Sequence, residues 1–412
     1  MDIYHNSERL KHFSSYLRSH QTLRDSHLNL VASENALSPL VRNALSNDLA
    51  GRYSSEFYGG SKITRTIIEY VNELAKELFQ CDFASVAPIS GNMCDLAAVN
   101  SLTSVGDTVA LVSMSNGGYP FQIEAFDRKV AYLPFDEEKW NLKYTELEQF
   151  YEIHTPKLTI LGASAFIYPY SIPKVIKHIK LDKQHIVYDG SHVLGLIAGR
   201  RFQNPLGEKI PVLFGSTHKS FPGPQGGIIL GNDQEIFDLM CHQFSIQTSE
   251  HPFGKHHGTI LVDNVHSNRI AALGFSLLEM LEFGQAYADQ VIKNTKSLGH
   301  ALQKHGFPVV NNNMFGISQS HQILMPMDTN GGLKFKEKLE NAGIFTDAFV
   351  RIGTSEITRR GFKEAEMKVI AELISLAINE EKEAHVIKKE VLDFCSNFTE
   401  LEFCFSEYKD LI

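Results

Sequence analysis

Lys219 is the residue whose surroundings point most directly to chemistry. It lies in a stretch of hydroxyl residues, glycines and prolines, residues 215–227, between the apolar runs 212–214 and 228–230. We expect these runs to form buried strands, which places the lysine on a short connection at the end of a sheet. Burial and nearby positive charge lower the pKa of a lysine from about 10.4, so that its free amine can attack a carbonyl. A surface lysine in a glycine-rich loop is the alternative.

Asp189 and His192 form a second candidate group. The apolar run 186–188 leads directly into Asp189, and His192 follows after a glycine and a serine. Sites in open α/β sheets form outside the carboxyl ends of strands, where we expect both Asp189 and Lys219. Pyridoxal 5'-phosphate (PLP) needs a lysine that holds its aldehyde and an acid that keeps its pyridine nitrogen protonated. A turn or helix-capping aspartate is the alternative for Asp189.

Ser90, Gly91 and Asn92 supply a third element, a turn of small residues. The apolar residues 96–99 continue after it at helical spacing. Backbone N–H groups at such a helix start, together with the helix dipole, bind phosphate without a lysine. By themselves, these residues fit an ordinary capped helix equally well.

Taken together, the motifs resemble the serine hydroxymethyltransferase family, PLP enzymes of fold type I. Ser90-Gly91-Asn92, Asp189 with His192, and Thr217-His218-Lys219 occur in the family's order. The resemblance extends from about residue 28 to the C-terminal region, with further matching segments at 30–35, 58–60, 223–227, 350–354 and 357–362. It implies an α/β fold, with a mostly parallel sheet in a large domain and a smaller α+β C-terminal domain.

The resemblance also implies roles for individual residues. Lys219 would form the Schiff base with PLP, Asp189 would pair with the pyridinium nitrogen, and His192 would lie beside the ring. The other implied cofactor contacts are Ser90, Gly91, Asn92, Asn116, Ser164 and Ser216, together with Tyr53 and Gly258. Tyr53, Tyr58 and Gly258 would reach across a homodimer interface into the partner's site. The implied substrate contacts are Ser33, Tyr58 and Arg351, the last through a bidentate contact with the α-carboxylate.

The chain departs from the family pattern on two sides of this site. Ser55 stands where the family has a glutamate near the substrate hydroxyl, and Glu56 is one place further on. Asn116 stands where a histidine stacks on the ring, although Tyr119 could compensate, and the loop before Arg351 is shortened. These changes leave the use of tetrahydrofolate undecided. They also leave His192, His218 and Glu56 as alternatives for the base at the β-hydroxyl.

The hypothesis for function is therefore a serine-hydroxymethyltransferase-like enzyme. Such an enzyme makes or breaks the Cα–Cβ bond of a β-hydroxy amino acid, in the manner of serine/glycine interconversion. One alternative is a threonine-type aldolase or transaldolase that passes a glycyl unit to another aldehyde. Another is a PLP-binding paralogue that has lost turnover. The expected partners are a small amino acid, an aldehyde and a second copy of the chain.

Composition sets the wider limits. The chain has 412 residues, 43% of them hydrophobic, and a net charge of -9, which predicts a globular protein without affinity for nucleic acid or membranes. Five cysteines without regular spacing indicate reduced thiols and a cytoplasmic location, and no secretory signal is evident. Adjacent His256 and His257 lack further ligands, so we expect no metal site.

Alternating apolar strands and helical stretches from about 65 to 265 predict a mostly parallel sheet with helices on both faces. We expect three units: a helical arm at 1–30, a PLP-binding large domain at 31–270 and a small domain at 271–412. The small domain should contain strands near 308–310 and 322–325, and helices near 333–342 and 363–380.

Overall fold

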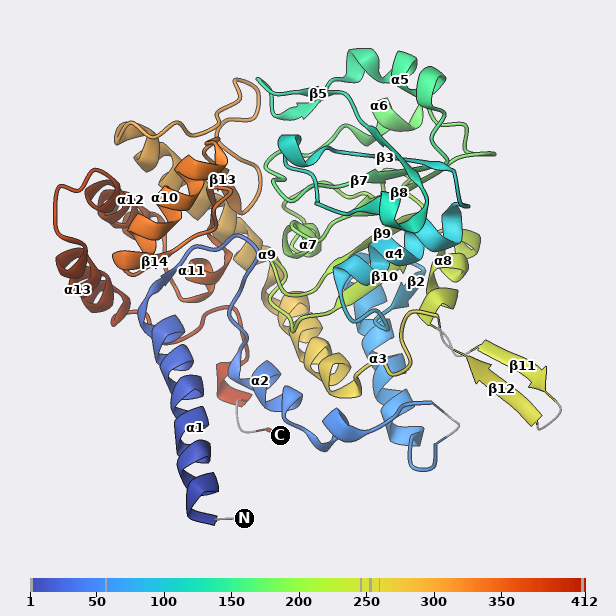
Figure 1. The fold of residues 1–412 in the computed structure, drawn as a ribbon, viewed down its shortest axis with the longest axis horizontal. Helices are drawn as coiled ribbons and strands as arrows, with labels where there is room; N and C mark the ends of the chain where they lie inside the picture. Colours follow the sequence, from blue (N-terminus) through green and yellow to red (C-terminus); the bar gives the residue numbers. More distant parts are fainter. Residues whose placement is uncertain (1–2, 56–57, 245–246, 252–253, 259, 409–410) are drawn as a thin grey trace.

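The computed structural model describes residues 3–55, 58–244, 247–251, 254–258, 260–408 and 411–412. Its centre is a seven-stranded sheet (Figure 1). The strand order is β2 (Phe83–Ser85), β10 (Gly227–Gly231), β9 (Val212–Ser216), β8 (His185–Asp189), β7 (Leu158–Leu161), β3 (Thr108–Leu111) and β4 (Lys129–Tyr132). Strands β9, β8, β7, β3 and β4 pair in parallel, and β10 is antiparallel to both β9 and β2. The predicted, mostly parallel sheet is confirmed.

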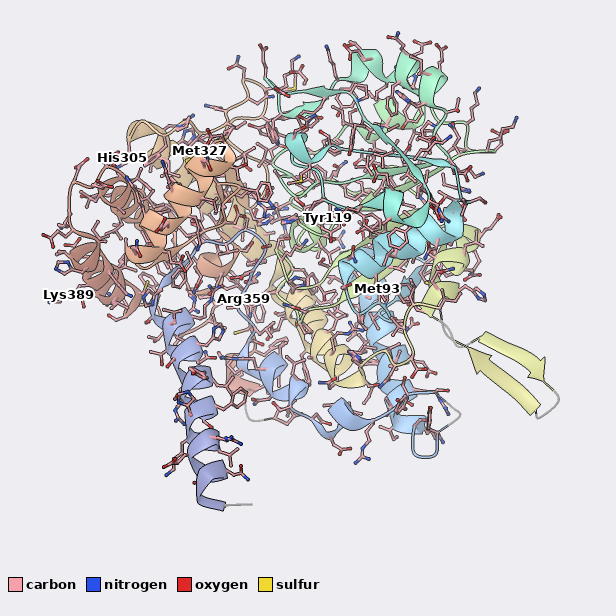
Figure 2. The ribbon with its side chains drawn as sticks, viewed as in Figure 1. Met93, Tyr119, His305, Met327, Arg359 and Lys389 are labelled. Atoms are coloured by element: carbon pink, nitrogen blue, oxygen red, sulfur yellow. The ribbon has the colours of Figure 1, made fainter. Side chains whose placement is uncertain are left out.

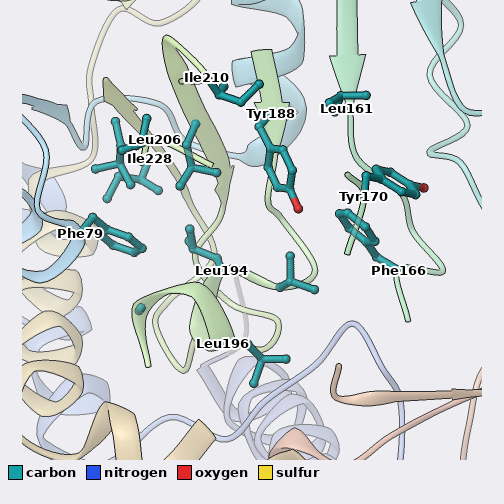
Figure 3. Close-up of a cluster of buried hydrophobic side chains, with 14 of the residues drawn as sticks. Phe79, Leu161, Phe166, Tyr170, Tyr188, Leu194, Leu196, Leu206, Ile210 and Ile228 are labelled. Carbon is teal, nitrogen blue, oxygen red and sulfur yellow. The ribbon is translucent and has the colours of Figure 1, made fainter. Parts of the chain in front are cut away.

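The sheet is buried on both faces, which explains why its strands read as continuous apolar runs. In β8, Val187 packs into one core with α4 (Gly91–Leu102) and α8 (Gln234–Cys241). Its neighbours Ile186 and Tyr188 point to the opposite face. That second core also takes side chains from α3 (Lys62–Phe79), α5 (Leu147–His154), α6 (Ile172–Ile176), α7 (Leu194–Ala198) and α9 (Ser267–Lys304). Figure 3 shows Tyr188, Leu161 and Ile228 reaching from the strands into it.

Helix α9 leads into a third core in the C-terminal part of the chain, to which it contributes Leu298, Ala301 and Leu302. Other helices of this part are α10 (Thr329–Asn341), α11 (Ser355–Arg359), α12 (Glu364–Ile378) and α13 (Ala384–Cys395). Its strands are β13 (Gln322–Leu324), paired antiparallel with β15 (Arg351–Gly353), and β1 (Leu28–Asn29), paired parallel with β14 (Ile344–Phe345). We propose that the boundary between the predicted domains 31–270 and 271–412 lies within α9.

The strand predicted near residues 308–310 is wrong. These residues run as a loop, in which the Val310 N–H donates to the Leu324 carbonyl at 2.9 Å without extending a ladder. The strand predicted near 322–325 is present as β13, and the helices predicted near 333–342 and 363–380 are α10 and α12.

Two elements project from the body in Figure 1. The first is α1 (Ile3–Ser26), in the region predicted as a helical arm. The second is the hairpin of β11 (Gln247–His251) and β12 (Gly254–Gly258). Smaller elements are α2 (Pro39–Leu45), β5 (Phe135–Asp136), β6 (Asn141–Leu142), η1 (Asp48–Gly51), η2 (Met114–Asn116), η3 (Ile123–Phe126), η4 (Tyr144–Glu146), η5 (His242–Phe244) and η6 (Ser406–Tyr408). In the described parts of the chain, no helix has the length and apolar character needed to cross a membrane.

Candidate active site

A cavity of about 210 Å³ lies where the parallel strands end. Asp189 is the last residue of β8, Ser216 is the last of β9, and Ser164 follows the end of β7. The start of α4 closes another side. The cavity thereby brings together nine residues predicted from the sequence: Ser90, Gly91, Asn92, Ser164, Asp189, His192, Ser216, His218 and Lys219.

The start of α4 forms a tight cup of hydroxyl groups. Ser90 is the N-cap, and its Oγ accepts a hydrogen bond from the Met93 N–H at 3.2 Å. A Cβ on Gly91 would lie 2.3 Å from the Ser216 Oγ and 2.9 Å from the Ser191 Oγ, so only glycine fits there. The N-terminus of a helix, surrounded by small hydroxyl side chains, suits a phosphate group.

Lys219 is poised as a nucleophile. Burial lowers the pKa of its amine, and the charge of Arg351 lowers it further, whereas Asp189 and Asp95 oppose the shift. The Asn35 side chain holds the backbone by donating to the Lys219 carbonyl at 2.9 Å. A lowered pKa increases the fraction of free amine at neutral pH, which is the form that attacks an aldehyde.

Asp189 is 8% exposed, and its Oδ1 accepts a hydrogen bond from the Ser191 N–H at 2.9 Å. This contact fixes the carboxylate at the wall of the cavity. A phosphate cup, a buried carboxylate and a lysine of lowered pKa in one cavity are the groups that PLP requires, so the residues present fit this cofactor.

Gln322 determines which nitrogen of His192 carries a proton. The Gln322 Oε1 accepts from the Phe166 backbone N–H at 3.1 Å, so its amide nitrogen must be the atom that faces His192. That nitrogen lies 2.8 Å from the His192 Nδ1 and donates to the Ser164 carbonyl at 3.1 Å. Because an amide nitrogen only donates, Nδ1 must accept, and the proton of the neutral imidazole is on Nε2. Burial and the charge of Lys219 also hold the pKa of His192 well below its usual value.

A second cavity, of about 350 Å³, adjoins the first. The two cavities share part of their wall, because both are lined by Tyr119, Ser164, His192 and Lys219. Tyr119 lies near the middle of the molecule, between the sheet and the C-terminal part (Figure 2). The second cavity also contains the predicted substrate contacts Ser33 and Arg351.

Arg351 is already oriented by its neighbours. Its Nε and Nη2 donate to the Asp347 carboxylate at 2.9 and 2.8 Å, and its Nη1 donates to the Ser164 carbonyl at 2.8 Å. Of the five guanidinium hydrogens, these contacts use three and leave one on each Nη nitrogen. That pair forms a fork for a carboxylate, and Asp347 fixes its direction.

Four other predicted residues, Tyr53, Tyr58, Asn116 and Gly258, line neither cavity. Tyr53 and Tyr58 are 45% and 43% exposed, and their ring centroids are 4.6 Å apart. Gly258 ends the projecting strand β12, and Glu56 lies outside the described residues. Asn116, expected at the ring face, belongs to η2 and lines neither cavity.

Tyr119, three residues further along the chain, is better placed than Asn116 to face a bound cofactor. It lines both cavities, and its hydroxyl donates to the Asn92 Oδ1 at 3.3 Å. The turn at Gly117, with φ of +83°, and the close approach of Gly118 to the Val112 carbonyl carry the chain past Asn116 to Tyr119. We therefore propose Tyr119 in place of Asn116 as the residue at the ring face.

A family model and two curated relatives all point to the same protein family. A family model described as serine hydroxymethyltransferase matches residues 10–374. The serine hydroxymethyltransferase of Thermoplasma volcanium is 35% identical, covering 95% of each chain. That of Methanocella arvoryzae is 36% identical, covering 92% of each chain.

This chain belongs to the serine hydroxymethyltransferase family. The predicted family and fold class are confirmed. Among solved structures, L-threonine transaldolase from Pseudomonas fluorescens superposes with a TM-score of 0.87 at 22% identity, covering 98% of this chain and 96% of that one. At this identity, the likeness shows a shared fold.

Several residues of this family member's site were not found from its sequence. Asp95, on α4 one turn after Gly91, lines the first cavity, and burial, reinforced by Asp189, raises its pKa well above the usual value. Gln322 positions His192 by a hydrogen bond, and Asp347 positions Arg351 in the same way. Gln322 could have been identified from its sequence, because it is a polar residue within the apolar pattern of a predicted strand. No sequence feature marked Asp347 as part of the site.

Proposed function

We propose that this chain is a PLP-dependent enzyme that makes or breaks the Cα–Cβ bond of a β-hydroxy amino acid, with glycine as the other amino acid. The observation that carries the proposal is the single cavity lined by Lys219, Asp189, His192 and the start of α4, which adjoins Arg351. The names of the curated relatives, serine hydroxymethyltransferases, support the same reaction type. Retention of this complete set argues against an inactive paralogue.

Each residue has a task that follows from its surroundings. Bound PLP would supply an electron sink that stabilises negative charge at the substrate Cα. Lys219 would hold the cofactor through its amine, Asp189 would pair with the ring nitrogen, and Ser90, Gly91 and Asn92 would bind the phosphate. Arg351 would orient the substrate by its α-carboxylate and so set which bond stands perpendicular to the ring.

The two histidines of the first cavity differ in what they can do with a proton. His192 presents an Nε2–H and therefore acts as a hydrogen-bond donor within the cavity. Burial lowers the pKa of His218 to about 4, so its ring is neutral at pH 7 and can accept a proton, although only as a weak base. We propose His218 rather than His192 as the group that accepts a proton. Glu56 remains a candidate from the sequence.

We also propose a cytoplasmic homodimer. Exposed apolar side chains on α1, with Leu10 67%, Phe13 63% and Leu17 59% exposed, support an interface between two copies. In the described parts of the chain, none of the five cysteines forms a disulfide, which supports a reducing compartment.

A second candidate, transfer of a glycyl unit between aldehydes, is supported by the large apolar side chains of Trp140, Leu324 and Phe349 in the wall of the second cavity. The test is glycine release from L-serine by the PLP-loaded protein, with and without tetrahydrofolate. Glycine release only with tetrahydrofolate supports hydroxymethyl transfer. Formaldehyde release that a second aldehyde stimulates, with the glycyl unit recovered in a new β-hydroxy amino acid instead of free glycine, supports transaldol transfer. The absence of glycine from every β-hydroxy amino acid under all conditions would refute the proposal.

A further inference from the structure

Asp95 is a second carboxyl group in the wall of the first cavity. It lies on α4, one turn after Gly91, and only 4% of the residue is exposed. Asp189 faces the same cavity from the end of β8. Lys219 is the one amine among the described residues that line this cavity, so two acids share a single amine. Two carboxylates with one basic partner leave surplus negative charge, which is costly away from water.

The two acids differ in their hydrogen bonds. Asp189 Oδ1 accepts from the Ser191 N–H at 2.9 Å, and a bond of this kind stabilises a negative carboxylate. No side chain or backbone group in the described part of the chain donates to the carboxyl of Asp95. Burial and the charge of Asp189 raise the pKa of Asp95 well above its usual value, and the charge of Lys219 opposes this shift.

The other titratable groups near Asp95 supply no positive charge. His192 and His218 line the same cavity, and burial lowers the pKa of both imidazoles, so they are neutral at pH 7. Tyr119 lines the cavity and Cys94 precedes Asp95 on α4, and burial raises the pKa of both groups, which are therefore neutral as well.

The elements packed on α4 do not change this balance. β9 and β10 contain no ionisable side chain. On α8, Glu235 and Asp238 are exposed, and burial raises the pKa of Cys241 to about 12. The charge of Arg269, on α9, acts on Cys94. Among the described residues, Lys219 is therefore the cation that acts on Asp95.

The cofactor would increase the need for a proton on Asp95. Its phosphate would bring negative charge to the start of α4, one turn away. The free backbone N–H groups that stabilise an anion belong to the first turn of a helix, and the effect of the dipole falls off beyond it. The Lys219 amine would be committed to the cofactor, and the charge of the ring nitrogen to Asp189. No positive group would then remain for Asp95.

We propose that Asp95 is a cofactor-binding residue that remains a neutral carboxylic acid in the PLP-loaded protein and donates a hydrogen bond into the cavity. The inference rests on the proposed function, because it requires PLP in this cavity. It gives the two acids different tasks: Asp189 is the counter-ion of the ring nitrogen, and Asp95 is a donor that adds no charge. A protonated acid has an O–H to donate, whereas a carboxylate only accepts. Two acids that share one site commonly divide in this way.

Infrared difference spectroscopy tests the protonation state without relying on turnover. The spectrum of PLP-loaded Asp95→Asn is subtracted from that of the loaded wild type at pH 7. We expect a carbonyl band of a neutral carboxylic acid, which moves on transfer to D2O. The control is Asp82→Asn, the same change at an exposed aspartate that lines neither cavity, and it should reveal the band of an ionised carboxylate.

The affinity for PLP separates hydrogen-bond donation from charge. Asp95→Asn retains an N–H donor, whereas Asp95→Leu has no donor in a side chain of similar length. We expect the Asp95→Asn apoprotein to bind PLP about tenfold or more tightly than the Asp95→Leu apoprotein, because the acceptors in this cavity, Asp189 and the phosphate, are charged. Urea unfolding checks that both apoproteins are folded. If Asp95→Asn does not fold, Asp95→Ser, which keeps a hydroxyl donor, replaces it in both experiments.

The outcomes distinguish this inference from the proposed function. An ionised carboxylate band for Asp95 in the loaded wild type would overturn the neutral acid alone. Equal PLP affinities of Asp95→Asn and Asp95→Leu would likewise overturn its role as a donor. Failure of the wild-type apoprotein to bind PLP at all would refute the proposed function itself.

Discussion

Replacement of Gln322 tests how the site controls the proton of His192. In Gln322→Glu, the Phe166 N–H keeps its acceptor, but a carboxylate oxygen replaces the amide N–H groups that now face His192 Nδ1 at 2.8 Å and the Ser164 carbonyl at 3.1 Å. A carboxylate can only accept, so Nδ1 must take up a proton. Two outcomes are then possible: Nε2 loses its proton and the ring stays neutral, or Nε2 keeps its proton and the ring becomes positively charged. We expect the pKa of His192 to rise, because a negative charge favours the imidazolium.

Gln322→Leu measures how much the hydrogen bonds of Gln322 contribute to the free energy of unfolding. It leaves two buried groups, the Phe166 N–H and the His192 Nδ1, without their present partner, whereas the Ser164 carbonyl still accepts from Arg351. At about 1–3 kcal/mol for each unsatisfied group, the expected loss in the free energy of unfolding is about 2–6 kcal/mol. Urea unfolding measures this loss.

The decisive assay is nitrogen NMR of protein labelled with ¹⁵N-histidine, with His192→Asn to identify the signal. In the wild type, we expect a protonated Nε2 and an unprotonated Nδ1 that do not change between pH 8 and about 5, because the pKa of His192 is far below its usual value. Gln322→Glu should protonate Nδ1 and bring titration into this range. Gln319→Glu, the same change in the same segment, should have no effect. A wild-type His192 that carries its proton on Nδ1, or titrates near pH 6.5, would refute the reasoning.

Three further predictions concern the cofactor cup, the carboxylate fork and acid stability. Gly91→Ala places a Cβ 2.3 Å from a serine hydroxyl and should weaken PLP binding to the apoprotein about tenfold or more, whereas Gly59→Ala, with open space around it, should not; equal affinities would contradict the cup. Arg351→Lys should raise KM for the amino acid by about tenfold or more in steady-state kinetics, because an ammonium cannot make the bidentate contact, and an unchanged KM would exclude this role. The pKa values of His218 and His321 are lowered to about 4 and about 3, mainly by burial, so their contribution to stability is complete above about pH 6.5 and is lost as the pH falls through 4 and 3. Urea unfolding at pH 7, 5 and 4 should show this decline, and a constant free energy of unfolding would contradict it.

The parts of the site that sequence could predict are those carried by short continuous motifs. Lys219 and Asp189 follow apolar runs that become β9 and β8, and strand ends of a parallel sheet meet at one edge. Ser90 is the N-cap of α4, a role that can be expected from the sequence because serine is a preferred N-cap residue.

The remaining contacts depend on how distant segments meet. Gln322 is separated from His192 by 130 positions along the chain, and no local pattern links them. The proposed exchange of Asn116 for Tyr119 depends on a glycine turn at Gly117 that packs closely against Ala165. The strand expected near residues 308–310 fails because β-propensity there is not matched by a partner ladder.

Reduction of the PLP-loaded protein with borohydride, followed by peptide mass spectrometry, tests the central claim most directly. The account predicts that the cofactor mass is found on the peptide that contains Lys219 and is missing in Lys219→Arg. A cofactor attached to another lysine, or no attachment at all, would contradict it.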